Sequence, residues 1–116
     1  MDGLKNTVAH SGPIVMLGGR QFVVPPMTLK VRRLDSESRK AMAAGYDELT
    51  EQDLLLQVVG ETLKRNYPDL DLKALENEIE YAELLEAYAT IKEQEAKHLA
   101  EMGKRLAAAA LGSADR

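Results

Sequence analysis

The stretch that decides the fold runs from Pro13 to Pro26 and reads PIVMLGGRQFVVPP. Two apolar runs rich in β-branched residues flank the pair Gly18-Gly19, and glycine at both positions permits the positive φ angles of a type I′ turn. The prolines at either end stop the strands from extending. The sequence therefore predicts a β-hairpin with a two-residue turn.

The length of this turn fixes which residues face each other, from Leu17 opposite Arg20 to Ile14 opposite Val23. Because successive side chains of a strand point to opposite faces, one face holds Val15, Leu17, Arg20 and Phe22, and the other holds Ile14, Met16, Gln21 and Val23. Both faces are mainly apolar, so the second is covered by helices of the same chain or by a neighbouring subunit. In the latter case the expected protein-binding residues are Ile14, Val15, Phe22 and Val23.

Capping residues delimit a first helix after the hairpin. Thr28 is the expected N-cap of a helix over residues 29–44, and Gly45 is its expected stop. The basic side chains of this region are Lys30, Arg32, Arg33, Arg39 and Lys40. They are interpreted as a solvated helix face, with a docking patch for an acidic protein surface as the alternative.

A second helix is predicted over residues 51–66. Thr50 and Asp53 resemble the two ends of a capping box. Apolar residues recur through the helix at helical spacing, at Leu54, Leu55, Val58, Val59 and Leu63. The helix must end before Pro68, because a proline forces the residue before it out of the α region.

The C-terminal third is predicted to be helical, with Asp71 as its N-cap. No glycine or proline occurs between Leu72 and Gly103, and an unbroken helix of about 40 residues would measure about 60 Å. A small domain cannot cover a rod of that length, so we expect the helix to be interrupted near Asn77–Glu80 or to project.

The last segment, residues 92–116, is predicted to be a charged, amphipathic helical tail. Its narrow apolar stripe consists of Leu99, Met102 and Leu106, followed by Ala109 and Ala110. The stripe either folds back on the domain or binds a partner in a groove or a coiled-coil seam. In the latter case Leu99, Met102 and Leu106 are the expected protein-binding residues of the tail.

Together these elements predict a mainly helical α+β protein. A flexible arm over residues 1–12 precedes a hairpin-plus-helix domain over 13–91, and the tail over 92–116 follows it. The expected fold is an N-terminal β-hairpin followed by a bundle of three or four helices, with a long C-terminal helix.

Composition argues against several classes of function. The net charge of −4 disfavours a nucleic-acid partner, which needs a dense cluster of Lys and Arg. The absence of cysteine excludes disulfides, thiolate catalysis and cysteine-ligated zinc. No apolar run reaches the roughly 18 residues that span a bilayer, and residues 1–5 do not resemble a signal peptide. We therefore expect a soluble intracellular protein without a membrane partner.

Candidate catalytic and metal-binding patterns are incomplete. Glu95 and His98 have the Glu-x-x-His spacing of di-iron bundles, which need two such motifs, and the chain has one. Asp69-x-Asp71 begins like a calcium loop, but Ala74 stands where that loop needs glycine. We therefore expect no enzymatic activity, no cofactor and no metal.

Two stretches resemble the tail assembly chaperones of long-tailed bacteriophages and prophages. Val15–Lys30 reads VMLGGRQFVVPPMTLK and resembles the family's strand, Gly-Gly turn, strand and proline step into a helix. Leu63–Leu70 reads LKRNYPDL and resembles the recurrent helix end before its third helix. The resemblance covers about residues 13–91. After Ile91 the chain departs from the family pattern, with a long charged helix in place of a short helix end and turn.

The resemblance implies a non-enzymatic protein of the bacterial host cytoplasm. It implies that the protein binds the tape measure protein, promotes polymerisation of the tail tube protein around it, self-associates, and is absent from the mature virion. The alternative is a structural minor tail or neck (tail completion) protein that is retained in the particle.

Overall fold

A computed structural model describes residues 8–45 and 47–114 of the chain. In that part the elements follow in the order β1 (Ile14–Leu17), β2 (Arg20–Val23), α2 (Leu29–Ala44), α3 (Glu48–Leu63), α4 (Leu72–Glu76) and α5 (Tyr81–Ala114). The predicted fold class, mainly helical α+β with an N-terminal hairpin and a long C-terminal helix, is confirmed.

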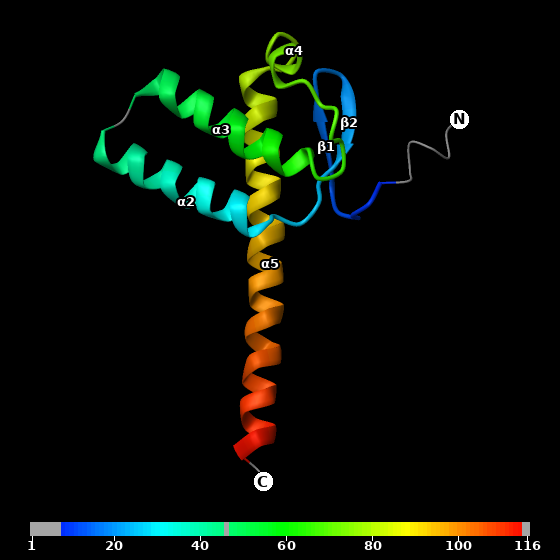
Figure 1. Ribbon diagram of the computed structural model, residues 1–116, viewed down its shortest axis with the longest axis vertical. Helices are drawn as coiled ribbons and strands as arrows, with labels where there is room; N and C mark the ends of the chain where they lie inside the picture. The colour runs from blue at the N-terminus through cyan, green and yellow to red at the C-terminus, as the bar shows by residue number, and fades with distance from the viewer. Residues whose placement is uncertain (1–7, 46, 115–116) are drawn as a thin grey trace.

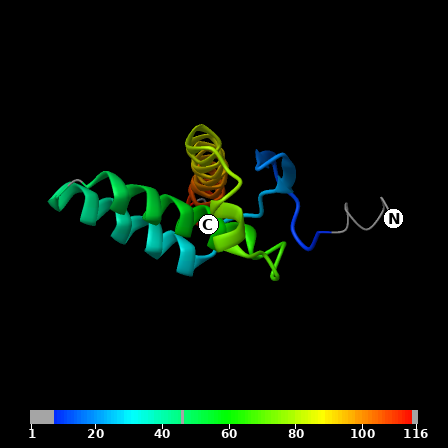
Figure 2. The ribbon, with the colours of Figure 1, turned by 90° about the horizontal axis from the view of Figure 1, so that it is seen from above.

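Helix α5 is the column around which the other elements are arranged (Figure 1). Helices α2 and α3 run side by side away from it, while the hairpin and α4 lie near its N-terminal end. Seen from above, the α2–α3 pair forms a thin layer beside the column (Figure 2). The molecule is accordingly flat, with extents of 59 × 47 × 20 Å, and the C-terminal part of α5 extends beyond the other elements.

The hairpin has the turn and the register that the sequence predicts. Gly18 and Gly19 have φ angles of 59° and 78°, in the left-handed region that favours glycine. The antiparallel pairing begins with Leu17 opposite Arg20, as expected for a two-residue turn. The turn thereby determines which strand residues face the helices.

The two faces of the hairpin differ in burial. The face with Val15 and Phe22 packs into the core, where the ring of Phe22 meets that of Tyr67 edge to face, with 5.2 Å between the ring centroids. The other face exposes Ile14 and Met16. The helices of the same chain therefore cover one face of the hairpin.

Helix α2 begins and ends at the predicted residues. The Thr28 hydroxyl accepts a hydrogen bond from the backbone N–H of Val31 at 3.2 Å, and Gly45 follows the last turn in an extended conformation. Val31, Asp35 and Ser38 are buried in this helix. The apolar spacing of the sequence did not predict that the two polar residues would be among them.

Helix α3 begins three residues earlier than predicted. Asp47 is the N-cap, and its carboxylate accepts hydrogen bonds from the backbone N–H and the hydroxyl of Thr50, at 3.1 and 2.6 Å. A carboxylate at this position also interacts favourably with the helix dipole. The helix ends at Leu63, and a turn over residues 64–66 replaces its predicted last turn.

The predicted interruption near Asn77–Glu80 is confirmed. Asp71 caps the short helix α4, as expected, and the chain then leaves the helical conformation before α5 begins. The carboxylate of Glu83 accepts hydrogen bonds from the backbone N–H of Glu80 at 3.0 Å and that of Gly18 at 3.1 Å. One side chain therefore both caps α5 and attaches the hairpin turn to its first turn.

The core lies where the hairpin, α3, α4 and the first turns of α5 meet. Its buried members are Val15, Leu17, Phe22, Val24, Val59, Leu63, Leu75, Leu84, Ala87 and Ile91. Ile91 is the last of them along α5, so the C-terminal part of that helix lies beyond the core.

The predicted N-terminal arm, residues 1–12, lies partly outside the described residues. Within the described part, the backbone of His10 exchanges two hydrogen bonds with the side-chain amide of Asn66, at 2.9 and 2.8 Å. Gly12 approaches the carbonyl of Val24 so closely that a Cβ atom would not fit. His10 and Gly12 therefore contact the domain within the predicted flexible arm.

Candidate protein-binding surfaces

The predicted hairpin residues divide between the core and the surface. Val15 and Phe22 are 6% and 5% exposed. They therefore belong to the core of this chain and do not lie on the exposed contact surface on which they were expected. Val23 is half-buried, and its backbone N–H donates to the hydroxyl of Tyr67 at 2.8 Å. Ile14 is 60% exposed, so it is the member of the predicted set that offers an open apolar side chain.

Met16 extends the open side of the hairpin. It lies two residues from Ile14 on the same face of β1 and is also exposed. A shallow groove of about 150 Å³ runs between this strand and α5, and Ala87 and Thr90 are among its lining residues. We call Ile14 and Met16 the hairpin surface.

The predicted tail residues all lie on the open surface of α5. Leu99, Met102 and Leu106 are exposed by 47%, 49% and 64%, and every side chain from Ala96 to Leu111 is exposed. The tail therefore projects from the domain and does not fold back on it. Contiguous exposed apolar surface is typical of interaction sites. We call Leu99, Met102 and Leu106 the tail face.

A charged network fixes α2 to α5 at the point where the tail begins. Asp35 is 1% exposed, and it accepts hydrogen bonds from the Tyr88 hydroxyl at 2.6 Å and from Lys92 Nζ at 2.7 Å. Lys92 also donates to Glu95 at 2.8 Å, and a guanidinium nitrogen of Arg32 lies 3.5 Å from the other Glu95 oxygen. The network thereby sets the direction in which the tail projects.

The same contacts fix the charges of the network. Burial alone would raise the pKa of Asp35, but hydrogen bonds from Lys92 and Tyr88 and the charges of Lys92 and Arg39 lower it below its ordinary value. Burial would lower the pKa of Lys92, but its bonds to Asp35 and Glu95 raise it. Burial and Asp35 both raise the pKa of Tyr88. Each group thus keeps one protonation state near neutral pH, as expected of a structural network and not of an acid–base catalyst.

Reasoning from the sequence missed this network. Asp35 lies among basic residues that were interpreted as a solvated face, yet Arg39 binds it at 3.3 Å and Arg32 approaches Glu95. The other partners of Asp35, on α5, lie 53 and 57 positions away in the sequence. A local signal was available only in the four-residue spacing from Asp35 to Arg39.

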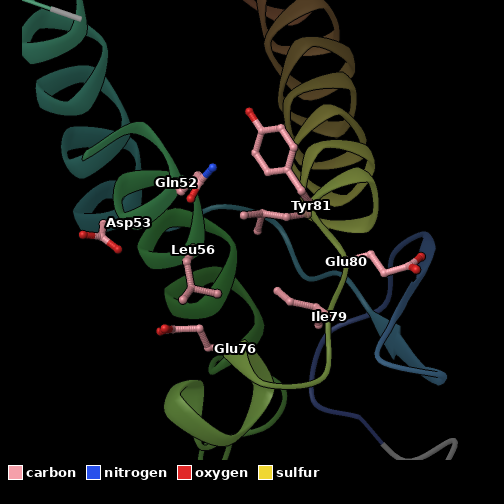
Figure 3. Close-up of a pocket in the computed structure, with 8 residues that line it drawn as sticks. Gln52, Asp53, Leu56, Glu76, Ile79, Glu80 and Tyr81 are labelled. Carbon is pink, nitrogen blue, oxygen red and sulfur yellow. The ribbon is translucent and has the colours of Figure 1, made fainter. Parts of the chain in front are cut away.

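A groove beside the start of α5 has carboxylates around its rim (Figure 3). Its volume is about 190 Å³, and it lies between α3, α4 and the beginning of α5. In this view the side chain of Glu80 points to the opposite side from those of Asp53 and Glu76. Paired acid–base chemistry requires two carboxyl groups that face one reacting atom, and Glu80 does not face the other two.

A second groove, of about 290 Å³, opens between α2, α3 and α5. Met42, Leu54 and Leu55 contribute to its apolar wall, and Asp35 lies at its edge. The oxygens of Asp35 already accept bonds from the network. No buried side-chain nitrogen or oxygen lacks a partner among the described residues, so the buried polar groups of this groove are already satisfied.

The single Glu-x-x-His motif is engaged in other contacts. Glu95 is bound by Lys92 and Arg32, and His98 is exposed. Across residues 8–45 and 47–114, no group of three or more His, Cys, Asp or Glu side chains is placed to hold a metal ion.

None of the helices in the described part of the chain is both long enough and apolar enough to cross a bilayer. Comparison with protein-family models, with curated proteins and with solved structures gave no match to this chain. The candidate sites are the hairpin surface and the tail face, on which large apolar side chains are exposed.

Proposed function

We propose that this chain is a tail assembly chaperone of a long-tailed bacteriophage or prophage, which binds the tape measure protein and promotes polymerisation of the tail tube. The observation that carries the proposal is the tail face, an apolar stripe that projects from a folded domain without cover from the described residues. A chaperone requires such a surface to hold an apolar helical segment of its client in the absence of the final assembly partner.

The resemblance in sequence supports the same proposal from a second direction. The stretches Val15–Lys30 and Leu63–Leu70, which resemble the chaperone family, contact each other in the fold. The side-chain amide of Asn66 donates to the carbonyl of Val23 at 3.0 Å, and Arg65 donates to the carbonyl of Pro26 at 2.8 Å. The residues that carry the resemblance therefore form one structural junction, between the hairpin and the end of α3.

In the proposed mechanism the domain acts as a rigid base for the tail. The Asp35–Lys92 contact and its neighbours hold α5 while the tail face binds a helical segment of the tape measure protein. The bound segment is thereby kept from aggregating until tube subunits replace the chaperone. The hairpin surface serves self-association.

Co-expression with the tape measure protein tests this function. We expect the chaperone to keep the tape measure protein soluble and to copurify with it, and Leu106→Glu to abolish both effects. Glu37→Ala, a change at an exposed position on α2, is the matched control. Unchanged solubility with the wild-type chain would refute the proposal. Mass spectrometry of purified particles separates a chaperone, which is absent, from a minor tail or neck protein, which is retained.

A further inference from the structure

The exposed part of the tail has an uncharged arc that is much wider than the tail face alone. At about 100° per residue, Ala107 and Ala109 lie about 80° to either side of Leu99, and Leu111 lies about 120° from it on the side of Ala107. The arc from Ala109 through Leu99 to Leu111 contains no charged side chain of residues 96–111, and all side chains in it are exposed. This surface, which we call the tail arc, spans about 200° of the helix.

The charged side chains of the tail lie on the remaining side of α5. Lys104 is about 140° from Leu99, while Glu101 and Arg105 are about 160° and 120° from it in the opposite sense. Ala108 lies among them, opposite Leu99. This side has the composition of a solvated helix face, whereas the tail arc has that of a face covered by other protein.

The width of the tail arc decides how many helices can cover it. Two helices of a coiled coil meet along a narrow stripe, and a stripe of about 100° or more is typical of a helix that packs against several neighbours. Across the arc, Ala107 and Ala109 are about 160° apart. One straight helix that lies over Leu99 and Leu106 therefore does not reach both, whereas two helices side by side cover the whole arc.

The area of contact leads to the same number. From Leu99 to Leu111 the tail arc is about 20 Å long, on a cylinder with an accessible radius of about 7 Å. A partner helix that covers about 100° of it buries roughly 500 Å² over both sides, and two helices bury roughly 1,000 Å². Specific protein interfaces bury at least about 1,000 Å², so two helices reach the required size and one does not.

We propose that the tail arc binds two helices of one partner, which lie side by side and present large apolar side chains to its two halves. This inference rests on the proposed function, since it assigns a two-helix architecture to the segment of the tape measure protein that the chaperone holds. The partner's side chains must be large because Gly103 and Ala110, near the centre of the arc, leave holes between the three large side chains of the tail face.

The start of α2 limits this site at its N-terminal end. A shallow groove of about 150 Å³ lies there between α2 and α5, and Leu29 and Leu99 are among its lining residues. Leu29 is 63% exposed, so it extends the apolar surface beyond the first turn of the tail. A partner helix that begins at this groove contacts Leu29 as well as the tail arc.

A bundle made of tails alone fits the arc less well. In a parallel bundle Gly103 and Ala110 of each copy would meet at the same layers, and layers of glycine and alanine leave space that no side chain fills. Helices that lie on a membrane surface commonly carry Trp or Phe on the apolar face, and residues 96–111 contain no aromatic residue. The arc therefore favours a protein partner with large side chains.

Two synthetic probes test the number of helices. One is a single helix of about 21 residues, and the other joins two copies of it through a flexible loop into a helical hairpin. Each helix has leucines along the face that pairs with its neighbour and along the face offered to the tail. Fluorescence anisotropy with the full chain measures both affinities. We expect the hairpin probe to bind at least about tenfold more tightly than the single helix, with little dependence on salt because the arc is uncharged.

Three successive alanines provide matched variants. Ala107→Glu and Ala109→Glu introduce the same charge on opposite halves of the tail arc, and Ala108→Glu introduces it on the solvated side as the control. All three side chains are exposed, and circular dichroism establishes that each variant is folded. We expect Ala107→Glu and Ala109→Glu each to weaken binding of the hairpin probe at least about tenfold, because the contact would bury an unpaired charge. Ala108→Glu is expected to change the affinity by less than about twofold.

Several outcomes would overturn the inference. These are equal affinity for the two probes, sensitivity at only one of Ala107 and Ala109, and an equal effect of Ala108→Glu. A trimer of the unbound chain that Ala107→Glu dissociates in sedimentation velocity would assign the arc to copies of this chain instead. Binding to phosphatidylserine vesicles without a preference between the probes would assign it to a membrane.

The same variants separate this inference from the proposed function. If the tape measure protein copurifies with the chain but only one half of the tail arc is sensitive to glutamate, only the inference fails. If both halves are sensitive with the hairpin probe and the tape measure protein does not copurify, the proposed function fails and the inference stands.

Discussion

At the scale of single residues, Asp35 is the charged group on which the joint between α2 and α5 depends. We predict that Asp35→Ala lowers the free energy of unfolding by about 2–4 kcal/mol, because it leaves the partly buried Tyr88 without its acceptor and Lys92 with Glu95 alone. Urea unfolding at neutral pH measures this change. Glu37→Ala, an exposed acid on the same helix, is expected to change stability by less than about 0.5 kcal/mol. An equal effect of the two substitutions would contradict the role of Asp35.

The lowered pKa of Asp35 also predicts how stability depends on pH. Because its folded-state pKa lies below the ordinary value of 3.8, the ionised form is favoured by folding. Its contribution is present above 3.8 and is lost as pH falls through the folded-state pKa. We therefore predict that the stability difference between the wild-type chain and Asp35→Ala shrinks steadily as pH is lowered below 3.8. Unfolding curves at a series of acidic pH values measure it, and a constant difference would contradict the prediction.

Residues whose role depends on local chemistry could be predicted from the sequence, and residues with distant partners could not. Gly18 and Gly19 predict the hairpin turn because glycine adopts positive φ without strain. Asp35 has the local sequence of a solvated helix face, and only its contacts with Tyr88 and Lys92, more than fifty positions away, make it a buried residue. The sequence alone does not show that these residues are close to one another in space.

At the scale of elements, the hairpin turn offers a matched pair of substitutions. Both glycines have positive φ, so alanine at either position is strained by about 1 kcal/mol or more. A Cβ at Gly18 would also lie 3.0 Å from Glu78 Cβ, whereas a Cβ at Gly19 would meet nothing within 4 Å. We predict that Gly18→Ala lowers the free energy of unfolding more than Gly19→Ala does, and that Gly19→Asn costs the least of the three. Thermal unfolding compares them, and an inverted order would show that the contact with Glu78 is not limiting.

Thr28 and Asp71 cap the helices for which the sequence predicts them. Asp47 and Thr50 are both competent caps, and Asp47 prevails because its carboxylate accepts two hydrogen bonds from Thr50. Whether the tail projects was also open from sequence alone, because an amphipathic stripe is equally suited to the chain's own core and to a partner.

At the scale of the whole molecule, charge is divided along the chain. Between residues 47 and 86 the sequence has twelve acidic and three basic residues, whereas residues 96–111 have three basic residues and one acidic residue. The exposed segment 96–111 of the tail thus carries a net positive charge, whereas the region of α3, α4 and the start of α5 is acidic. Such a division favours the approach of an acidic surface to this segment over its approach to α3 and α4.

The two apolar surfaces lie at different places on this molecule, so their roles are separable. Ile14 lies on the hairpin beside residues 83–90 of α5, whereas Leu106 lies on the projecting tail. We predict that Ile14→Glu weakens self-association and leaves capture of the tape measure protein unchanged, while Leu106→Glu has the opposite pair of effects. The reason is that Ile14 and Leu106 belong to separate apolar surfaces, so a charge introduced at one leaves the apolar contact at the other intact. Sedimentation velocity measures self-association and copurification measures capture. If either substitution abolished both self-association and capture, one surface would mediate both contacts. The assignment of self-association to the hairpin and of capture to the tail would then be wrong.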